Sequence, residues 1–119
     1  MISVINAKQD FPNADYGVFL VEREIELSGR LGVDALVVIH GYGSHGKGGE
    51  IKKQLHIKLK ELKHKNIIVN FFKGEQWAEF DEEIKQLKQQ EPELIMHPLL
   101  TNLNSGVTVV WIRKNRLAK

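Results

Sequence analysis

ALVVIHGYGSHGKGGEIKK, residues 35–53, is the stretch that decides the fold of this chain. The apolar run 35–39 stops at His40, glycine recurs from Gly41 to Gly49, and a lysine-bearing helical pattern begins near Glu50. This order predicts a strand, a glycine turn and the start of a helix. Glycine lets backbone N–H groups approach a ligand closely, and the helix directs the positive end of its dipole at the same point. An anion is therefore the expected ligand, and a phosphate group is the first candidate.

The length and composition indicate one domain, residues 1–119, because 42% of the residues are hydrophobic and suffice for a single core. The chain has no cysteine, which excludes disulfide frameworks and thiolate metal sites. Its apolar runs are short, and the N-terminus lacks a basic segment before an apolar one, so we expect neither a membrane span nor a signal peptide. A cytoplasmic protein is the expectation.

The distribution of charge is more informative than its sum. A net charge of +2 is too small to indicate a nucleic-acid-binding protein by itself. Lysine and histidine crowd between Lys47 and Lys65, however, whereas acids dominate from Glu75 to Glu93. We therefore expect a molecule with a basic side and an acidic side.

Apolar spacing on both sides of the turn predicts the remaining elements. Strands are expected at residues 2–5, 35–39, 67–72 and 107–112, and residues 94–96 are a candidate for a further short strand. Helices are expected at residues 14–31, from about residue 50 to 63, and at 75–90, where apolar side chains recur every three or four residues. The predicted fold is α/β, a two-layer sandwich whose mixed four-stranded sheet carries two main helices and an inserted third helix at about residues 75–91.

The third predicted helix is mostly acidic and amphipathic. Trp77 and Phe80 share their spacing with Ile84 and Leu87, so we expect all of them in the core. Stacking of Trp77 or Phe80 on nucleic-acid bases is the alternative that this spacing disfavours.

Two motifs carry a resemblance to a known family. IHGYGSHGKGGEIK, residues 39–52, resembles the glycine turn and following helix of the Smr (small MutS-related) domain, and SGVTVVWIR, residues 105–113, resembles its closing strand. The resemblance implies a two-layer α/β fold, nucleic-acid binding and, in many members, nicking or cleavage of DNA or RNA. The family usually opens with Leu-Asp-Leu-His-Gly, whereas residues 7–10 here are Ala-Lys-Gln-Asp. The chain thus resembles a divergent member of the Smr family. The predicted acidic helix resembles an insertion into the Smr fold.

The turn and the helix start are the predicted binding surface for DNA or RNA. The residues expected to contact the phosphate backbone are His40, Gly41, Tyr42, Gly43, Ser44, Lys47, Gly48, Lys52 and Lys53. Backbone amides and lysines hold phosphates without reading base sequence, so we expect sequence-tolerant binding. His40 ends a buried strand, where α/β folds place ligand-contacting groups. A base, a phosphate donor and a turn stabiliser remain open as its role, since a pKa near neutrality permits all three.

Two other functions stay open from the sequence. The first is an endonuclease with His40 and Asp10 as candidate catalytic residues in a rearranged site, for which a divalent metal is conceivable. The second is a protein-interaction module whose contact surface is the acidic third helix. Deletion of that helix is expected to abolish capture of a protein partner and to spare nucleic-acid binding.

Two further sites are not expected. Residues 41–47 match the first part of a P-loop, but Gly48 stands where Ser or Thr would hold magnesium, so a nucleotide cofactor is not predicted. His40 and His45 flank the turn without a defined third ligand, so no metal site is predicted from them.

Overall fold

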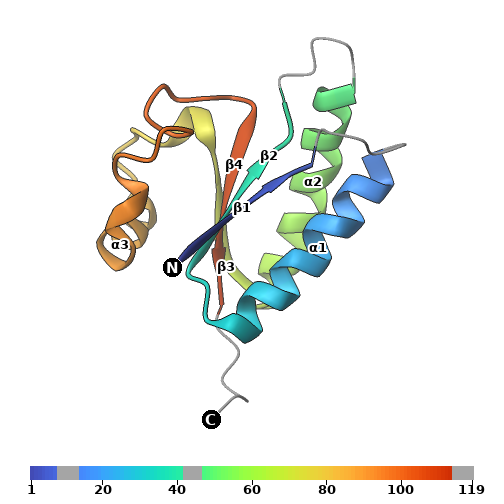
Figure 1. Ribbon diagram of the computed structural model, residues 1–119, viewed down its shortest axis with the longest axis horizontal. Helices are drawn as coiled ribbons and strands as arrows, with labels where there is room; N and C mark the ends of the chain where they lie inside the picture. The colour runs from blue at the N-terminus through green and yellow to red at the C-terminus, as the bar shows by residue number, and fades with distance from the viewer. Residues whose placement is uncertain (8–13, 42–46, 114–119) are drawn as a thin grey trace.

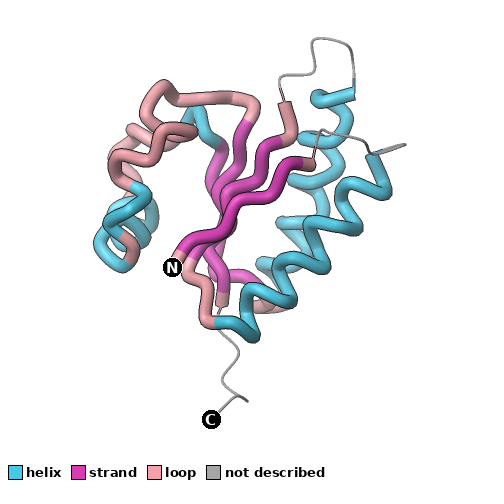
Figure 2. Tube along the Cα trace, in the orientation of Figure 1, coloured by secondary structure: helices cyan, strands magenta, loops and turns pink. Residues whose placement is uncertain are grey.

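The computed structural model describes residues 1–7, 14–41 and 47–113, with residues 47–49 described by their backbone alone. Four strands and three α-helices make up most of this part of the chain (Figures 1 and 2). In chain order these elements are β1 (Ile2–Asn6), α1 (Ala14–Leu31), β2 (Ala35–Ile39), α2 (Lys47–His64), β3 (Ile68–Lys73), α3 (Glu82–Gln90) and β4 (Val107–Ile112). Two short 3-10 turns, η1 (Gly74–Gln76) and η2 (Pro92–Leu94), flank α3.

The strands form one mixed sheet in the order β1-β2-β4-β3. β1 and β2 are parallel, whereas β4 runs antiparallel to both β2 and β3. β2 and β4 therefore lie in the middle of the sheet, and β2 carries no polar residue, as is typical of a strand that is buried on both faces. The predicted α/β class and the mixed four-stranded sheet are confirmed.

Two main helices cover one face of the sheet (Figure 1). α1 packs its buried positions Val18, Val21 and Ile25 against the sheet, and Ser28 is the next buried position along the helix. α2 contributes four inward side chains to the same cluster, namely Ile51, Leu55, Leu59 and Leu62. The predicted spacing of both helices is thus confirmed.

The third helix lies on the opposite face of the sheet, a position that the sequence pattern does not specify (Figure 1). Ile84 and Leu87 of α3 join Trp77, Leu94 and strand residues that point away from α1 and α2 in a second buried cluster. The sheet is therefore covered on both faces, and the segment after β3 is part of the core.

Two local predictions for this segment are wrong. The helix expected at residues 75–90 is divided, because α3 begins only after Asp81, whose carboxylate accepts hydrogen bonds from the amides of Glu83 and Ile84. The intervening turn shifts the helical phase, so Phe80 is fully exposed and does not pack into the core, whereas Trp77 is buried as expected. Residues 94–96 form no strand, because Pro92 opens the 3-10 turn η2 and Ile95 and Met96 are exposed.

No helix in the described part of the chain is long and apolar enough to span a membrane.

Candidate functional site

A buried histidine joins β2 to the predicted glycine turn. The side chain of His40 is 0% exposed. Its ring nitrogen Nδ1 lies 3.0 Å from the carbonyl oxygen of Gly41, and Nε2 lies 2.9 Å from Oγ1 of Thr108 on β4. The backbone amides of His40 and Gly41 both donate to the carbonyl oxygen of Gly106, over 2.9 and 3.0 Å. Gly41 has a φ of +81°, a conformation that favours glycine.

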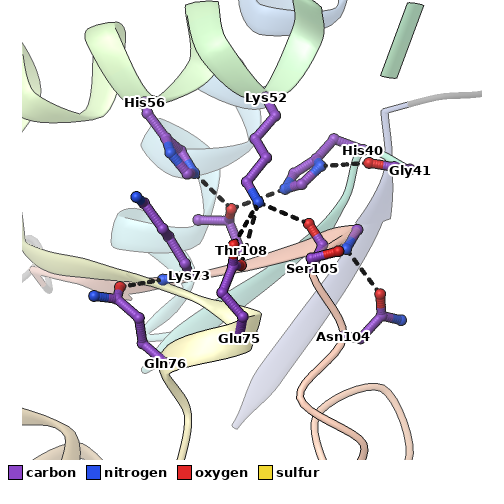
Figure 3. A network of polar contacts seen from close by, with 11 residues as sticks. His40, Gly41, Lys52, His56, Lys73, Glu75, Gln76, Asn104, Ser105 and Thr108 are labelled. Carbon is purple, nitrogen blue, oxygen red and sulfur yellow. Dashed lines mark hydrogen bonds and ion pairs between the residues drawn. The ribbon is translucent and has the colours of Figure 1, made fainter. Parts of the chain in front are cut away.

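Thr108 links His40 to a second histidine, His56 of α2 (Figure 3). Nε2 of His56 lies 2.8 Å from the same Thr108 hydroxyl oxygen, which is itself buried. The carbonyl of Gly41 can only accept, so Nδ1 of His40 carries a hydrogen and Nε2 accepts from the Thr108 hydroxyl. The hydroxyl oxygen then accepts from Nε2–H of His56, and Nδ1 of His56 keeps its lone pair.

Both histidines are neutral in this arrangement. Burial lowers the pKa of His40, and the positive charge of Lys52 acts in the same direction. Burial also lowers the pKa of His56, to about 4, and His40, Lys52 and Lys73 add to the effect. Glu75 opposes the shift in both rings. The chain of two histidines and one threonine therefore carries no charge near pH 7.

An ion pair between Lys52 and Glu75 lies beside these histidines (Figure 3). The ammonium nitrogen of Lys52 lies 2.9 and 3.2 Å from the two carboxylate oxygens of Glu75, and it also donates to the carbonyl of Ser105 over 3.0 Å. Lys52 thereby ties α2 to η1 and to the loop before β4. It is only partly exposed, at 23% of its side chain, so it is not a freely solvated cation.

The outer side of α2 carries the exposed positive charge. Lys53 and Lys60 are seven residues apart and so lie on one face of the helix, opposite its buried side chains, and Lys63 lies beside them. All three side chains are exposed, and within the described residues none forms an ion pair. We call Lys53, Lys60 and Lys63 the outer lysines.

The structure brings together only some of the residues predicted as a site. His40, Gly41 and Lys52 meet at the end of β2, and Lys53 points outward from the same helix. Lys47 and Gly48 lie in the first turn of α2, where the backbone alone is described. The remaining predictions, Asp10, Tyr42, Gly43 and Ser44, lie outside the described residues, as does His45.

Sequence reasoning missed three members of the site. Thr108 had a signal, because it is a polar residue in an otherwise apolar strand on the side that faces α2. The sequence signal for His56 was weaker. His56 follows Lys52 by four residues and so lies on the same side of the helix as Lys52. Glu75 had none, because its contact with Lys52 spans 23 residues of sequence.

The arrangement offers hydrogen-bond donors, lysine charges and a titratable nitrogen, all at the carboxyl end of β2. Among the described residues no group of three or more histidine, cysteine or acidic side chains is arranged to hold a metal ion. The fold and the site define a mixed α/β domain with a hydrogen-bonded His-Thr-His chain at the carboxyl end of β2. Compared with known proteins, the chain matches no protein-family model, no curated protein and no solved structure.

Proposed function

We propose that this chain is an Smr-like domain that binds the phosphate backbone of DNA or RNA through the turn after β2 and the exposed side of α2. The observation that carries the proposal is the row of outer lysines, which have no carboxylate partner in the described part of the chain. Lysines that keep their charge free are available to replace the counterions of a phosphate backbone.

The position of the two family-like motifs supports the same proposal. The turn at His40 and the loop before β4 meet through the two hydrogen bonds to Gly106. A Cβ at Gly106 would lie 3.2 Å from the carbonyl carbon of Gly41, so the two backbones pack tightly. Segments that resemble the Smr glycine turn and closing strand thus lie next to each other, beside the N-terminal half of the basic helix.

Salt dependence of binding tests the proposal. Native protein is titrated with labelled single-stranded and double-stranded DNA and RNA at several salt concentrations, and the double variant Lys53→Ala/Lys60→Ala is measured alongside it. We expect affinity to fall steeply with salt, and the slope of log K against log salt to decrease by about two in the variant, about one for each lost phosphate contact.

The matched control removes the same charge elsewhere. Lys65→Ala/Lys85→Ala takes away one lysine beyond the end of α2 that pairs with Glu61 and one on α3, across the sheet. This control should keep the native salt slope. Binding that ignores salt, or equal losses in the two double variants, would contradict the proposal.

The same incubations, with and without divalent metal, are followed for strand cleavage. Cleavage that is lost in a folded His40→Ala variant would replace the binding proposal with the endonuclease alternative, in which Asp10 is the other candidate.

One observation favours a second function, a protein-interaction module. Phe80 is fully exposed beside α3, and it lines an open groove of about 590 Å³ together with acidic side chains such as Glu79 and Glu82. Exposed aromatic side chains are frequent anchors of protein interfaces. If a protein partner uses this surface, Phe80→Ser should abolish its capture and leave the salt-sensitive binding of nucleic acid unchanged.

A further inference from the structure

His56 has one ring nitrogen that the hydrogen-bonded chain does not use. Nε2 donates to Thr108, whereas Nδ1 has no hydrogen-bond partner among the described residues. The ring is only half-buried, and the one buried side-chain atom without a partner in the described part of the chain is Oγ of Ser28. Nδ1 of His56 is therefore reachable from solvent and can accept or, once protonated, donate a hydrogen bond.

The groups around His56 come from every element packed against it. Lys52 lies one turn earlier on α2, His40 approaches from β2 with ring centroids 6.2 Å apart, and Lys73 at the end of β3 points toward the ring (Figure 3). Among the described residues Glu75 of η1 supplies the one carboxylate, and Phe71 of β3 packs on the ring with centroids 5.4 Å apart. Two ammonium groups against one carboxylate leave an excess of positive charge beside the free nitrogen.

We propose that Nδ1 of His56 and the ammonium group of Lys73 form a phosphate-binding position beside the Lys52–Glu75 ion pair, and that its occupation takes up a proton at His56. The proposal deepens the proposed function, on which it rests, by naming one contact of the bound backbone and its dependence on pH.

The physical reason is the change of charge that a phosphate brings. In the free protein, burial and the neighbouring lysines keep His56 neutral. A phosphate oxygen near Nδ1 offsets the lysine charges and accepts a hydrogen bond that only the protonated ring can donate. By linkage, the ligand that raises the pKa of His56 also binds more tightly as pH falls, by up to about tenfold for each unit of that rise.

Nuclear magnetic resonance of the histidine rings tests this directly in the native chain. The pKa of His56 is measured in free protein, in the presence of inorganic phosphate, and in complex with a single-stranded oligonucleotide. We expect a pKa of about 4 in free protein and an upward shift of one unit or more with either ligand. An unshifted His56 in a saturated complex would overturn the inference.

A matched pair of variants gives a second readout. His56→Gln keeps an amide donor for Thr108 but cannot take up a proton, whereas His64→Gln removes an exposed histidine at the end of the same helix. Oligonucleotide affinity of folded His56→Gln should lose the increase between pH 7.5 and pH 4.5 that native protein and His64→Gln show. If His64→Gln abolishes the increase instead, the inference is wrong.

The two proposals fail in different ways. If nucleic acid binds in a salt-sensitive way and the pKa of His56 does not shift, the phosphate-binding position is wrong and the proposed function is unaffected. If inorganic phosphate raises the pKa of His56 but the protein binds no oligonucleotide, the phosphate-binding position is supported and the proposed function is wrong.

Discussion

His40 shows how burial narrows the role of a residue. The sequence leaves a base, a phosphate donor and a turn stabiliser open for it. In the structure both of its ring nitrogens are bonded, one to Gly41 and one to Thr108, and the ring is buried. This geometry favours the turn stabiliser, because a ring with both nitrogens engaged holds the end of β2 against β4. His56, whose Nδ1 is free, is the better placed of the two rings to meet a ligand.

Thr108→Val tests the central hydroxyl. Valine keeps the shape of threonine but leaves Nε2 of His40 without a donor and Nε2–H of His56 without an acceptor in a buried place. We expect the free energy of unfolding to fall by about 1–3 kcal/mol, the usual cost of an unsatisfied buried polar group. Urea denaturation measures it.

Thr101→Val is the control for this change, because it makes the same substitution at an exposed threonine. It should alter stability by less than about 0.5 kcal/mol. Equal effects of the two substitutions on the free energy of unfolding would show that the hydrogen bonds of the Thr108 hydroxyl do not stabilise the fold.

At the scale of elements, the segment after β3 has two distinct parts. Its inward side chains complete the second buried cluster, whereas Phe80, Glu79 and Glu82 face solvent. Deletion of the whole segment would therefore uncover one face of the sheet and unfold the chain, so it cannot separate protein binding from nucleic-acid binding. Single substitutions on its outer surface can.

A pair of substitutions in and before α3 makes the distinction measurable. Leu87 is 0% exposed, so Leu87→Ala should lower the free energy of unfolding by about 2–5 kcal/mol through lost burial and a residual cavity. Phe80 is fully exposed, so Phe80→Ala should change it by less than about 0.5 kcal/mol. Chemical denaturation of both variants checks this, and a stable Leu87→Ala protein would mean that α3 is not part of the core.

At the scale of the whole molecule, charge differs between the segments that cover the two faces of the sheet. The basic helix α2 lies on one side, and the acidic segment around α3 lies on the other. The face that carries α2 is not uniformly basic, because α1 beside it has more acidic than basic residues. The Lys52–Glu75 pair lies where the two regions meet, since η1 leads from β3 toward α3. A backbone ligand on α2 would thus approach from the side away from the acidic helix.

Global stability should depend on pH because the folded chain holds His40 and His56 neutral. Their pKa values are lowered in the fold, to about 4 for His56, whereas an unfolded histidine titrates near about 6.5. Between these values the unfolded chain binds more protons, so stability is full above about pH 6.5 and decreases as pH falls toward 4. Denaturation midpoints at pH 7.5, 6 and 5 measure it. His56→Gln should have a shallower decrease, and a native midpoint that rises on acidification would contradict the linkage.

The sequence by itself determined the elements whose signal is local. Apolar residues at helical spacing placed α1 and the inward face of α2, and an uninterrupted apolar run placed β2 in the middle of the sheet. Such periodicity is present in consecutive residues, so it needs no knowledge of distant segments. It failed at Phe80, because one turn before α3 was enough to change the phase of the pattern.

Only the tertiary structure decided which side chains meet. His56 and Thr108 are 52 residues apart, and Lys52 and Glu75 are 23 apart, yet the order β1-β2-β4-β3 brings them to one end of the sheet. The same packing placed α3 on the far face. Strand order and packing depend on how whole faces bury one another, which no short window of sequence contains, and so β2 and α2 were predictable whereas the contacts of His40 and Lys52 were not.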